Sequence, residues 1–180
     1  MSATRDQLLR AAADFLGRRP NATQDEIAAA VGVSRATLHR HFAGRSALME
    51  ALERLAIAEL RQVLESVRLD QGSASDALRR LVEACEPVSP YLALLYSQSQ
   101  EVDIDTTIEI WDEIDTAITD LFLRGQRTGE FRPELTAAWL TEAFYSLVGG
   151  TVWAIRAGRV GSRDFGRLIT DLLLNGVSTT

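Results

Sequence analysis

Residues 23–48 constrain the fold of this chain more than any other stretch, because their pattern is typical of two short helices joined by a tight turn. Thr23 and Glu26 have the three-residue spacing of a capping box, which marks the start of a helix. Gly32 stands where this helix should end, because glycine enters the left-handed backbone conformation at little cost. Ser34 follows soon after, and its hydroxyl can cap a second helix. The stretch therefore predicts a helix-turn-helix.

The second helix of this motif separates apolar from polar side chains. Leu38 and Phe42 are four residues apart, so they share one face and are predicted to pack inward. The outward side chains are polar or basic, namely Arg35, Thr37, His39, Arg40 and His41. A short basic helix held by an apolar clamp has the form in which a helix-turn-helix enters the major groove of DNA.

The motif resembles the DNA-binding signature of tetracycline-repressor-like (TetR) regulators. The matching residues are Thr23, Ile27, Ala28, Val31, Gly32, Val33, Ser34, Leu38, the ring at His39, Phe42, Arg45 and Leu48. The resemblance covers about the first quarter of the chain, and the remainder is similar in layout only. Three positions depart from the family: it usually has Tyr at His39, often Lys at Arg45, and commonly a small apolar residue at Gln24.

Phosphate contacts position a protein on DNA, whereas contacts to base edges specify sequence. Thr23 and Gln24 lie at a predicted helix N-terminus, where free N–H groups attract phosphate. By resemblance, His39 and Arg45 also contact the backbone. Base-edge candidates are Arg35, Thr37 and Arg40, and which arginine reads a base stays open. The predicted DNA-binding set is Thr23, Gln24, Ser34, Arg35, Thr37, His39, Arg40, His41 and Arg45.

The charge distribution resolves an apparent conflict with DNA binding. The net charge is −6, but residues 1–50 hold seven arginines against five carboxylates, and residues 51–180 hold twelve arginines against twenty carboxylates. All 19 basic residues are arginine, whose planar fork suits phosphate and guanine. The basic footprint is therefore expected on the N-terminal part alone.

Several function classes are disfavoured. Both histidines, His39 and His41, lie in the motif, and their i, i+2 spacing points them to different helix faces, so no metal site is predicted. Cys85 is the only cysteine, which excludes a disulfide within the chain. No glycine-rich phosphate loop is present, and neither a cofactor nor enzymatic activity is expected. The polar N-terminus and the absence of an apolar run of about 20 residues predict a cytoplasmic protein without a membrane span.

Helical spacing recurs along the whole chain, which predicts an all-α fold of about nine helices. The expected helices cover approximately 4–17, 23–31, 34–42, 45–70, 74–86, 91–96, 104–128 and 134–157, and a last helix starts at Ser162 and includes Leu173. A three-helix DNA-binding domain is predicted over 1–45. An effector-binding and dimerisation domain is predicted over 46–180, as the resemblance implies.

By resemblance, the second domain holds a small-molecule pocket and forms a homodimer. Candidate ligand-binding residues are Tyr91, Tyr96, Trp111, Phe122, Phe144 and Tyr145. Candidate dimerisation residues on the last two helices are Leu147, Gly150, Ala154, Phe165, Leu168 and Leu172. An acidic stretch follows residue 100: Glu101, Asp103, Asp105, Glu109, Asp112, Glu113 and Asp115. These carboxylates are either a solvated helix start or the source of one inward carboxylate for a cationic ligand.

Together these features predict a ligand-responsive transcriptional regulator. As a homodimer it would bind a palindromic double-stranded DNA operator, most simply as a repressor released by a small molecule. Two reading helices would then lie about 34 Å apart, or a multiple of that distance. The alternative is a small-molecule or protein binding module whose helix-turn-helix no longer reads DNA.

Overall fold

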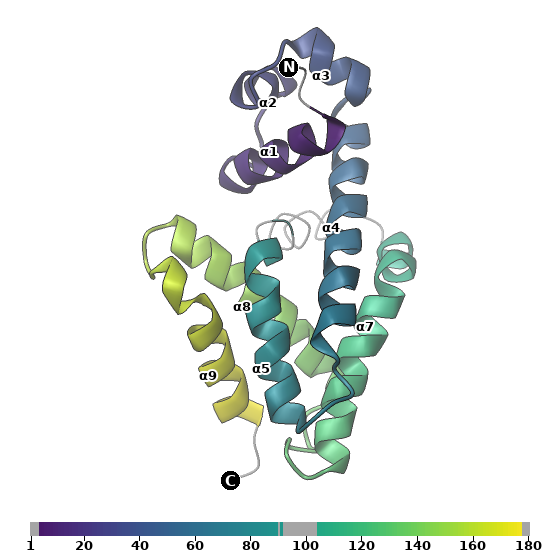
Figure 1. Cartoon of the computed structure of the whole chain (residues 1–180), viewed down its shortest axis with the longest axis vertical. Coiled ribbons are helices and arrows are strands. Elements are labelled where there is room, and N and C mark those ends of the chain that lie inside the picture. Colours follow the sequence, from purple (N-terminus) through teal and green to yellow (C-terminus); the bar gives the residue numbers. More distant parts are fainter. Residues whose placement is uncertain (1–3, 90, 92–103, 178–180) are drawn as a thin grey trace.

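The computed structural model describes residues 4–89, 91 and 104–177, without the side chains of 104–111. The described α-helices are α1 (Arg5–Arg18), α2 (Gln24–Ala30), α3 (Arg35–His41), α4 (Arg45–Val67), α5 (Ala74–Cys85), α7 (Ile104–Arg127), α8 (Ala137–Arg156) and α9 (Phe165–Val177). Two 3-10 turns are η1 (Glu86–Val88) and η2 (Ser162–Asp164). The all-α prediction is confirmed (Figure 1). The helix expected over 91–96 lies outside the described residues except for Tyr91.

Short-range capping sets most of the helix starts. Thr4 and Thr23 each form a complete capping box, with Gln7 and Glu26 respectively. The α8 helix starts three residues later than expected because the Thr136 side chain accepts from the backbone N–H of Trp139. Such caps satisfy N–H groups that have no partner inside the helix, which is why their spacing is visible in sequence.

The apolar side chains form two separate cores. The N-terminal core joins α1, α2, α3 and the first turns of α4, and the C-terminal core joins the rest of α4 to α5, α7, α8 and α9. The long helix α4 belongs to both, with Leu48 and Leu52 in the first core and Ile57 and Leu60 in the second. In Figure 1, α4 runs from the upper group of helices into the lower one. A shift of α4 in the C-terminal core would therefore reach the N-terminal core directly.

Two arginines hold the far end of α4. Arg80 on α5 donates to the carbonyl oxygens of Val67, Arg68 and Gln71, at 3.1, 3.1 and 2.7 Å. Arg124 on α7 donates to the carbonyl oxygens of Leu69 and Gly72, at 2.7 and 2.8 Å. The last carbonyl groups of a helix lack internal partners. The two guanidinium groups supply hydrogen-bond donors to these carbonyl groups and connect the α4–α5 loop to α5 and α7.

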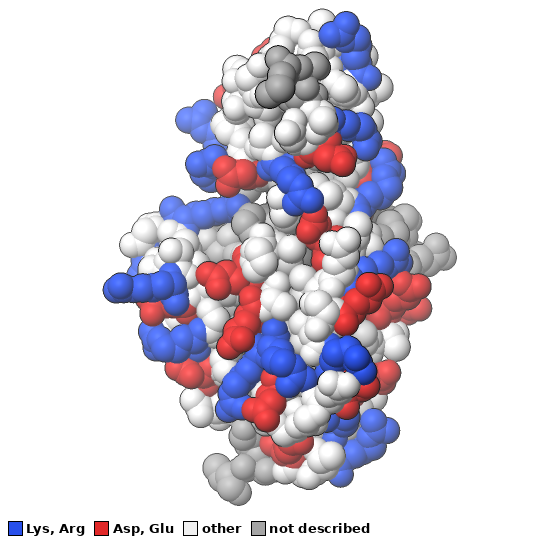
Figure 2. All heavy atoms as spheres, in the orientation of Figure 1, with Lys and Arg blue, Asp and Glu red and all other residues white. Residues whose placement is uncertain are grey.

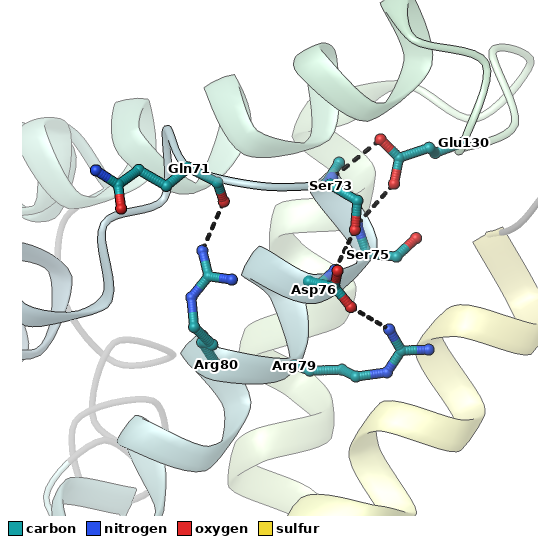
Figure 3. Close-up of polar contacts among 8 residues, drawn as sticks. Gln71, Ser73, Ser75, Asp76, Arg79, Arg80 and Glu130 are labelled. Atoms are coloured by element: carbon teal, nitrogen blue, oxygen red, sulfur yellow. Dashed lines mark hydrogen bonds and ion pairs between the residues drawn. The ribbon is translucent and has the colours of Figure 1, made fainter.

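The N-terminus of α5 is capped from a distant part of the chain. The Glu130 carboxylate accepts from the backbone N–H groups of Ala74 and Ser75, at 3.0 and 2.9 Å, while Ser73 caps Asp76 (Figure 3). Desolvation acts to raise the pKa of Glu130, but the hydrogen bonds from Ser75, Ala74 and Thr128 outweigh it and lower the pKa to about 2. The folded chain therefore stabilises the ionised carboxylate of Glu130 relative to its protonated form.

Replacing Glu130 by glutamine should lower the free energy of unfolding near neutral pH by about 1 kcal/mol, because the α5 cap loses its charge. The folded-state pKa lies below the ordinary value of 4.5, so the wild-type contribution is present above that value and is lost as the pH falls toward 2. Thermal unfolding of both proteins near pH 7 and near pH 3 measures this. The two proteins should differ less at the acid pH, and a difference that grew there would contradict the assignment.

Candidate nucleic-acid interface

The turn between α2 and α3 has the geometry that its sequence predicts. Gly32 adopts a left-handed backbone with φ of 74°. The backbone N–H of Val33 donates to the carbonyl oxygen of Ala28 at 3.0 Å, which closes the turn. Leu38 and Phe42 are buried in the N-terminal core. The turn therefore fixes α3 against α1 and α2 while leaving its other face exposed.

The exposed face of α3 carries the predicted reading residues. Ser34 caps the helix by accepting from the Thr37 backbone N–H, and the two hydroxyl oxygens are 2.9 Å apart. Arg40 donates to the Thr37 hydroxyl at 3.1 Å, and Arg35 pairs with Asp25 of α2 at 3.0 Å. His39 is exposed, whereas His41 is half-buried beside Phe42. Surface pairs of this kind are weak, so both arginines remain available for other partners.

The start of α2 offers one donor without a protein partner. Thr23 and Glu26 are fully engaged with each other in the capping box. The Gln24 amide Nε2 is enclosed and has no hydrogen-bond partner among the described residues. A buried donor left unpaired costs free energy, and a phosphate oxygen that reached it would remove that cost.

Arg45 has a structural role that the sequence did not reveal. Its guanidinium donates to the carbonyl oxygens of Ala22, at 2.7 Å, and of Pro20, so it ties the α1–α2 loop to the first turn of α4. Gly44, which precedes α4, has a φ of 103°. The residue predicted to contact phosphate is thus also the one that holds α2 against α4.

Arg5 of α1 is a further residue at the candidate interface, and its sequence context does not predict this role. Its guanidinium carbon lies 5.1 Å from the centre of the Phe42 ring, a cation–π arrangement that covers the end of α3. Arg5 and Phe42 are 37 positions apart, so no local sequence pattern predicts their contact.

Surface charge is less divided than the sequence totals suggest. Figure 2 shows arginines on both the upper and the lower part of the face in view, with carboxylates interspersed among them. Several exposed arginines of the chain pair with carboxylates, such as Arg61 with Glu113 and Arg79 with Asp76. The positive excess expected at residues 1–50 is therefore a modest one.

Two arginines bridge the N-terminal and C-terminal cores. Arg10 on α1 forms an ion pair with Glu59 on α4. At the end of α8, the Arg156 guanidinium lies so close to α1 that a Cβ on Gly17 would be 2.2 Å from its Nη1 atom. Partial burial lowers the pKa of Arg156, because it disfavours the charged form of the guanidinium. Both contacts link α1 to helices of the C-terminal core.

The predicted ligand-binding residues are spread over different environments. Phe122 and Phe144 are fully buried in the C-terminal core, and Tyr91 packs partly against both cores. Tyr145 donates from its hydroxyl to the half-buried Asp115 carboxylate at 2.5 Å. Tyr96 and the side chain of Trp111 lie outside the described residues.

Among the described carboxylates of the acidic stretch, Asp112, Glu113 and Asp115, it is Asp115 that is half-buried. Desolvation raises its pKa, and the hydrogen bond from Tyr145 opposes this in part. Its neighbour Glu113 instead points to Arg61 at 2.8 Å and is largely exposed. The described part of the stretch therefore contains both kinds of carboxylate that the sequence left open.

An apolar face of α8 and α9 is exposed to solvent. Leu172, predicted to lie in a dimer interface, is 60% exposed, and Gly150 is exposed as well. Leu147, Ala154 and Leu168 are half-buried, whereas Phe165 is enclosed in the C-terminal core. Helix α8 also exposes two tryptophans that were not predicted to lie in the dimer interface, Trp139 at 62% and Trp153 at 57%. The guanidinium carbon of Arg159 lies 4.3 Å from the centre of the Trp153 ring.

Within the described part of the chain, no helix has both the length and the apolar character needed to cross a membrane.

Comparison with known proteins gives one consistent result. Residues 8–52 match the model of bacterial regulatory proteins of the tetR family. The HTH-type transcriptional regulator NfxB of Pseudomonas aeruginosa is 35% identical over 175 residues, covering 96% of this chain and 94% of NfxB. The HTH-type transcriptional repressor LfrR of Mycolicibacterium smegmatis is 28% identical over 169 residues, covering 94% and 88%.

Solved structures agree with the sequence relatives. The TetR-like regulator LfrR from Mycobacterium smegmatis, solved in complex with proflavine, superposes with a TM-score of 0.76 at 29% identity, covering 98% of this chain and 97% of that one. The regulator MbdR from Azoarcus has the same fold, with a TM-score of 0.74 at 20% identity and coverage of 98% and 100%.

Proposed function

The chain belongs to the tetR family of bacterial regulatory proteins and is a DNA-binding transcriptional regulator, and we propose that it acts as a repressor whose operator is a palindrome bound by a homodimer. Residues 1–45 would read DNA, and residues 46–180 would bind the effector and dimerise. No catalytic role is assigned, and the protein would act in the cytoplasm, where its operator is. The observation that carries this proposal is the polar outer face of α3, anchored by the buried Leu38 and Phe42.

The geometry of the α3 face supports direct readout. Arg35 and Arg40 lie on exposed turns, and either guanidinium could form the paired hydrogen bonds that guanine accepts in the major groove. Thr37 presents a methyl group suited to thymine. His39 and Gln24 would hold phosphates on either side, which fixes the register of the helix on the duplex.

Release by a small molecule is the second part of the proposal. LfrR binds proflavine, an organic cation, and this chain resembles LfrR over almost its whole length. We therefore assign an organic cation as the class of effector. Because α4 belongs to both cores, a ligand that moves α4 would change the separation of the two reading helices and so weaken binding to both half-sites at once.

The test is a selection of bound fragments from random duplex DNA at one fixed, near-physiological salt concentration, since the salt sets the nonspecific background. Enrichment of a palindrome is the expected result, and its half-site spacing gives the distance between reading helices. Addition of proflavine should release the selected DNA. If no sequence were enriched, the regulator would have lost sequence reading, and a binding module with an idle helix-turn-helix would be the better description.

Substitutions at Arg40 and Arg45 should have different consequences. Arg40→Ala should cost about 1–3 kcal/mol on the selected operator and relax preference at one base position, if that guanidinium pairs with guanine. Arg45→Ala should weaken binding to all sequences alike, because it releases the Pro20 and Ala22 carbonyl groups and loosens α2. Affinities for the operator and for one scrambled duplex measure both effects.

Arg54→Ala is the matched control for these variants. It removes an exposed arginine further along α4 that pairs only with Glu50 of its own helix, at 3.9 Å. Its operator affinity should stay close to wild type. A change of sequence preference in Arg45→Ala would reverse the roles assigned to Arg40 and Arg45.

A further inference from the structure

A pocket of about 320 Å³ lies where the N-terminal and C-terminal cores meet. Its lining comes from α1, α4, α5, η1 and Tyr91, so it is bounded by the DNA-reading part and by the effector part together. Its size is at the lower end of the range found for small-molecule sites. The residues that matter for its chemistry are Arg10, Glu59, Val63, Ala84, Val88 and Tyr91.

The walls of this junction pocket are of two kinds. Val63, Ala84 and Val88 provide an apolar surface, and Tyr91 adds an aromatic ring that packs against both cores. The lining also includes both members of the Arg10–Glu59 ion pair. A carboxylate beside an aromatic ring and apolar walls is the combination that recognises an organic cation.

The two members of the ion pair are not held equally. The Glu59 side chain is only 20% exposed, while that of Arg10 is 50% exposed and reaches over from the other core. Glu59 and then Tyr91 raise the pKa of Arg10, because both stabilise its charged form. Half of the Arg10 side chain is exposed, so water can solvate the guanidinium when another cation displaces it from Glu59.

We propose that the junction pocket binds an organic cation, which takes the place of Arg10 against Glu59 and lies on the Tyr91 ring. Arg10 is then a cation supplied by the chain itself in the position that the ligand occupies. This inference rests on the proposed release of DNA by a small molecule and names a site and a trigger for it. Loss of the Arg10–Glu59 pair removes one arginine link between α1 and the helices of the C-terminal core, while the described contact of Arg156 with Gly17 stays in place.

A competing site lies within the C-terminal core. The half-buried Asp115 carboxylate accepts from Tyr145 and has no ion-pair partner among the described residues. It is distant in sequence from the junction and belongs to α7, which does not line the junction pocket. Both sites contain a carboxylate and a tyrosine, so cation binding alone cannot distinguish them. The response to Arg10 can, because only the junction pocket contains an internal competitor.

The experiment measures proflavine binding by fluorescence in the full-length wild type and in Glu59→Gln, Arg10→Ala and Asp115→Asn. Glu59→Gln should weaken binding about tenfold or more, because the cation loses its charged acceptor. Arg10→Ala should strengthen binding about two- to fivefold, because it removes the competitor. Asp115→Asn should bind as wild type does. Circular dichroism of each variant confirms that it is folded.

Two controls sharpen this design. Glu113→Gln breaks the Arg61–Glu113 pair, which also joins two helices but lies outside the pocket, and it should leave proflavine binding unchanged. The anionic tricycle 9-anthracenecarboxylate should bind weakly to wild type and should not lose affinity in Glu59→Gln. This comparison separates charge recognition from binding to apolar walls.

The inference is overturned if folded wild type fails to bind proflavine, if Glu59→Gln and Arg10→Ala shift affinity in the same direction, or if Asp115→Asn alone abolishes binding. These readouts need no DNA. Failure here with an intact operator selection would therefore remove only the junction site, whereas failure of the operator selection would remove the proposed function and leave the cation result standing.

Discussion

Replacing Phe42 by alanine should abolish specific DNA binding. The ring is fully enclosed in the N-terminal core, where it closes α3 against α1 and carries the Arg5 guanidinium on its outer side. Truncating a buried phenylalanine costs about 3–5 kcal/mol, most of the stability that so small a helical unit can have. We expect residues 5–52 to lose fixed structure, while the C-terminal core stays helical. Operator binding, circular dichroism and amide hydrogen exchange of the two regions measure these effects.

The matched control is Phe131→Ala, which makes the same truncation in the C-terminal core. Phe131 is equally buried and packs against Phe122, with ring centres 5.9 Å apart. Its loss should lower the melting temperature but leave α1, α2 and α3 protected from exchange. If Phe42→Ala bound its operator normally, or if both variants lost protection in the same helices, the two cores would not be separate units.

The parts of the structure that sequence predicted best are those fixed by neighbours within a few residues. The Thr23 box, the left-handed Gly32 and the Ser34 cap all depend on contacts no more than five positions apart, and all three are present. Periodicity likewise placed the long helices, since their apolar faces repeat along the chain. Cys85 lies on the buried face of α5, and burial raises the pKa of its thiol to about 12.

The parts that escaped prediction depend on side chains meeting across long stretches of chain. Glu130 caps a helix 55 positions away, and Arg10 pairs with a carboxylate 49 positions away. A sequence shows that these residues are charged but not which partner each will find. The same limit applies to Arg45, whose family role suggested phosphate while its guanidinium also holds two backbone carbonyl groups. Trp139, Gly150 and Trp153 have the helical spacing that places them on one face of α8. This spacing could have predicted that the two tryptophans are exposed together with Gly150.

Replacing Leu172 by arginine should convert the proposed dimer to monomers. Leu172 is 60% exposed on α9, beside an α8 face that exposes Gly150, Trp139 and Trp153. A large exposed apolar face on a helix pair indicates contact with another protein surface. An arginine buried in that contact without a partner would raise the free energy of the dimer. A monomer engages one half-site only, so operator affinity should fall about 10²- to 10⁴-fold through lost avidity.

Sedimentation equilibrium and operator binding on the same samples connect the two effects. The matched control is Leu123→Arg, which places the same charge on an exposed leucine of α7. It should remain dimeric and bind the operator as wild type does. Because dimerisation and DNA binding are linked, the loss in Leu172→Arg should be partly recovered at high protein concentration. A monomer that bound the full palindrome at wild-type affinity would mean that the two half-sites are read without cooperation between subunits, and the α8–α9 face would then need another partner.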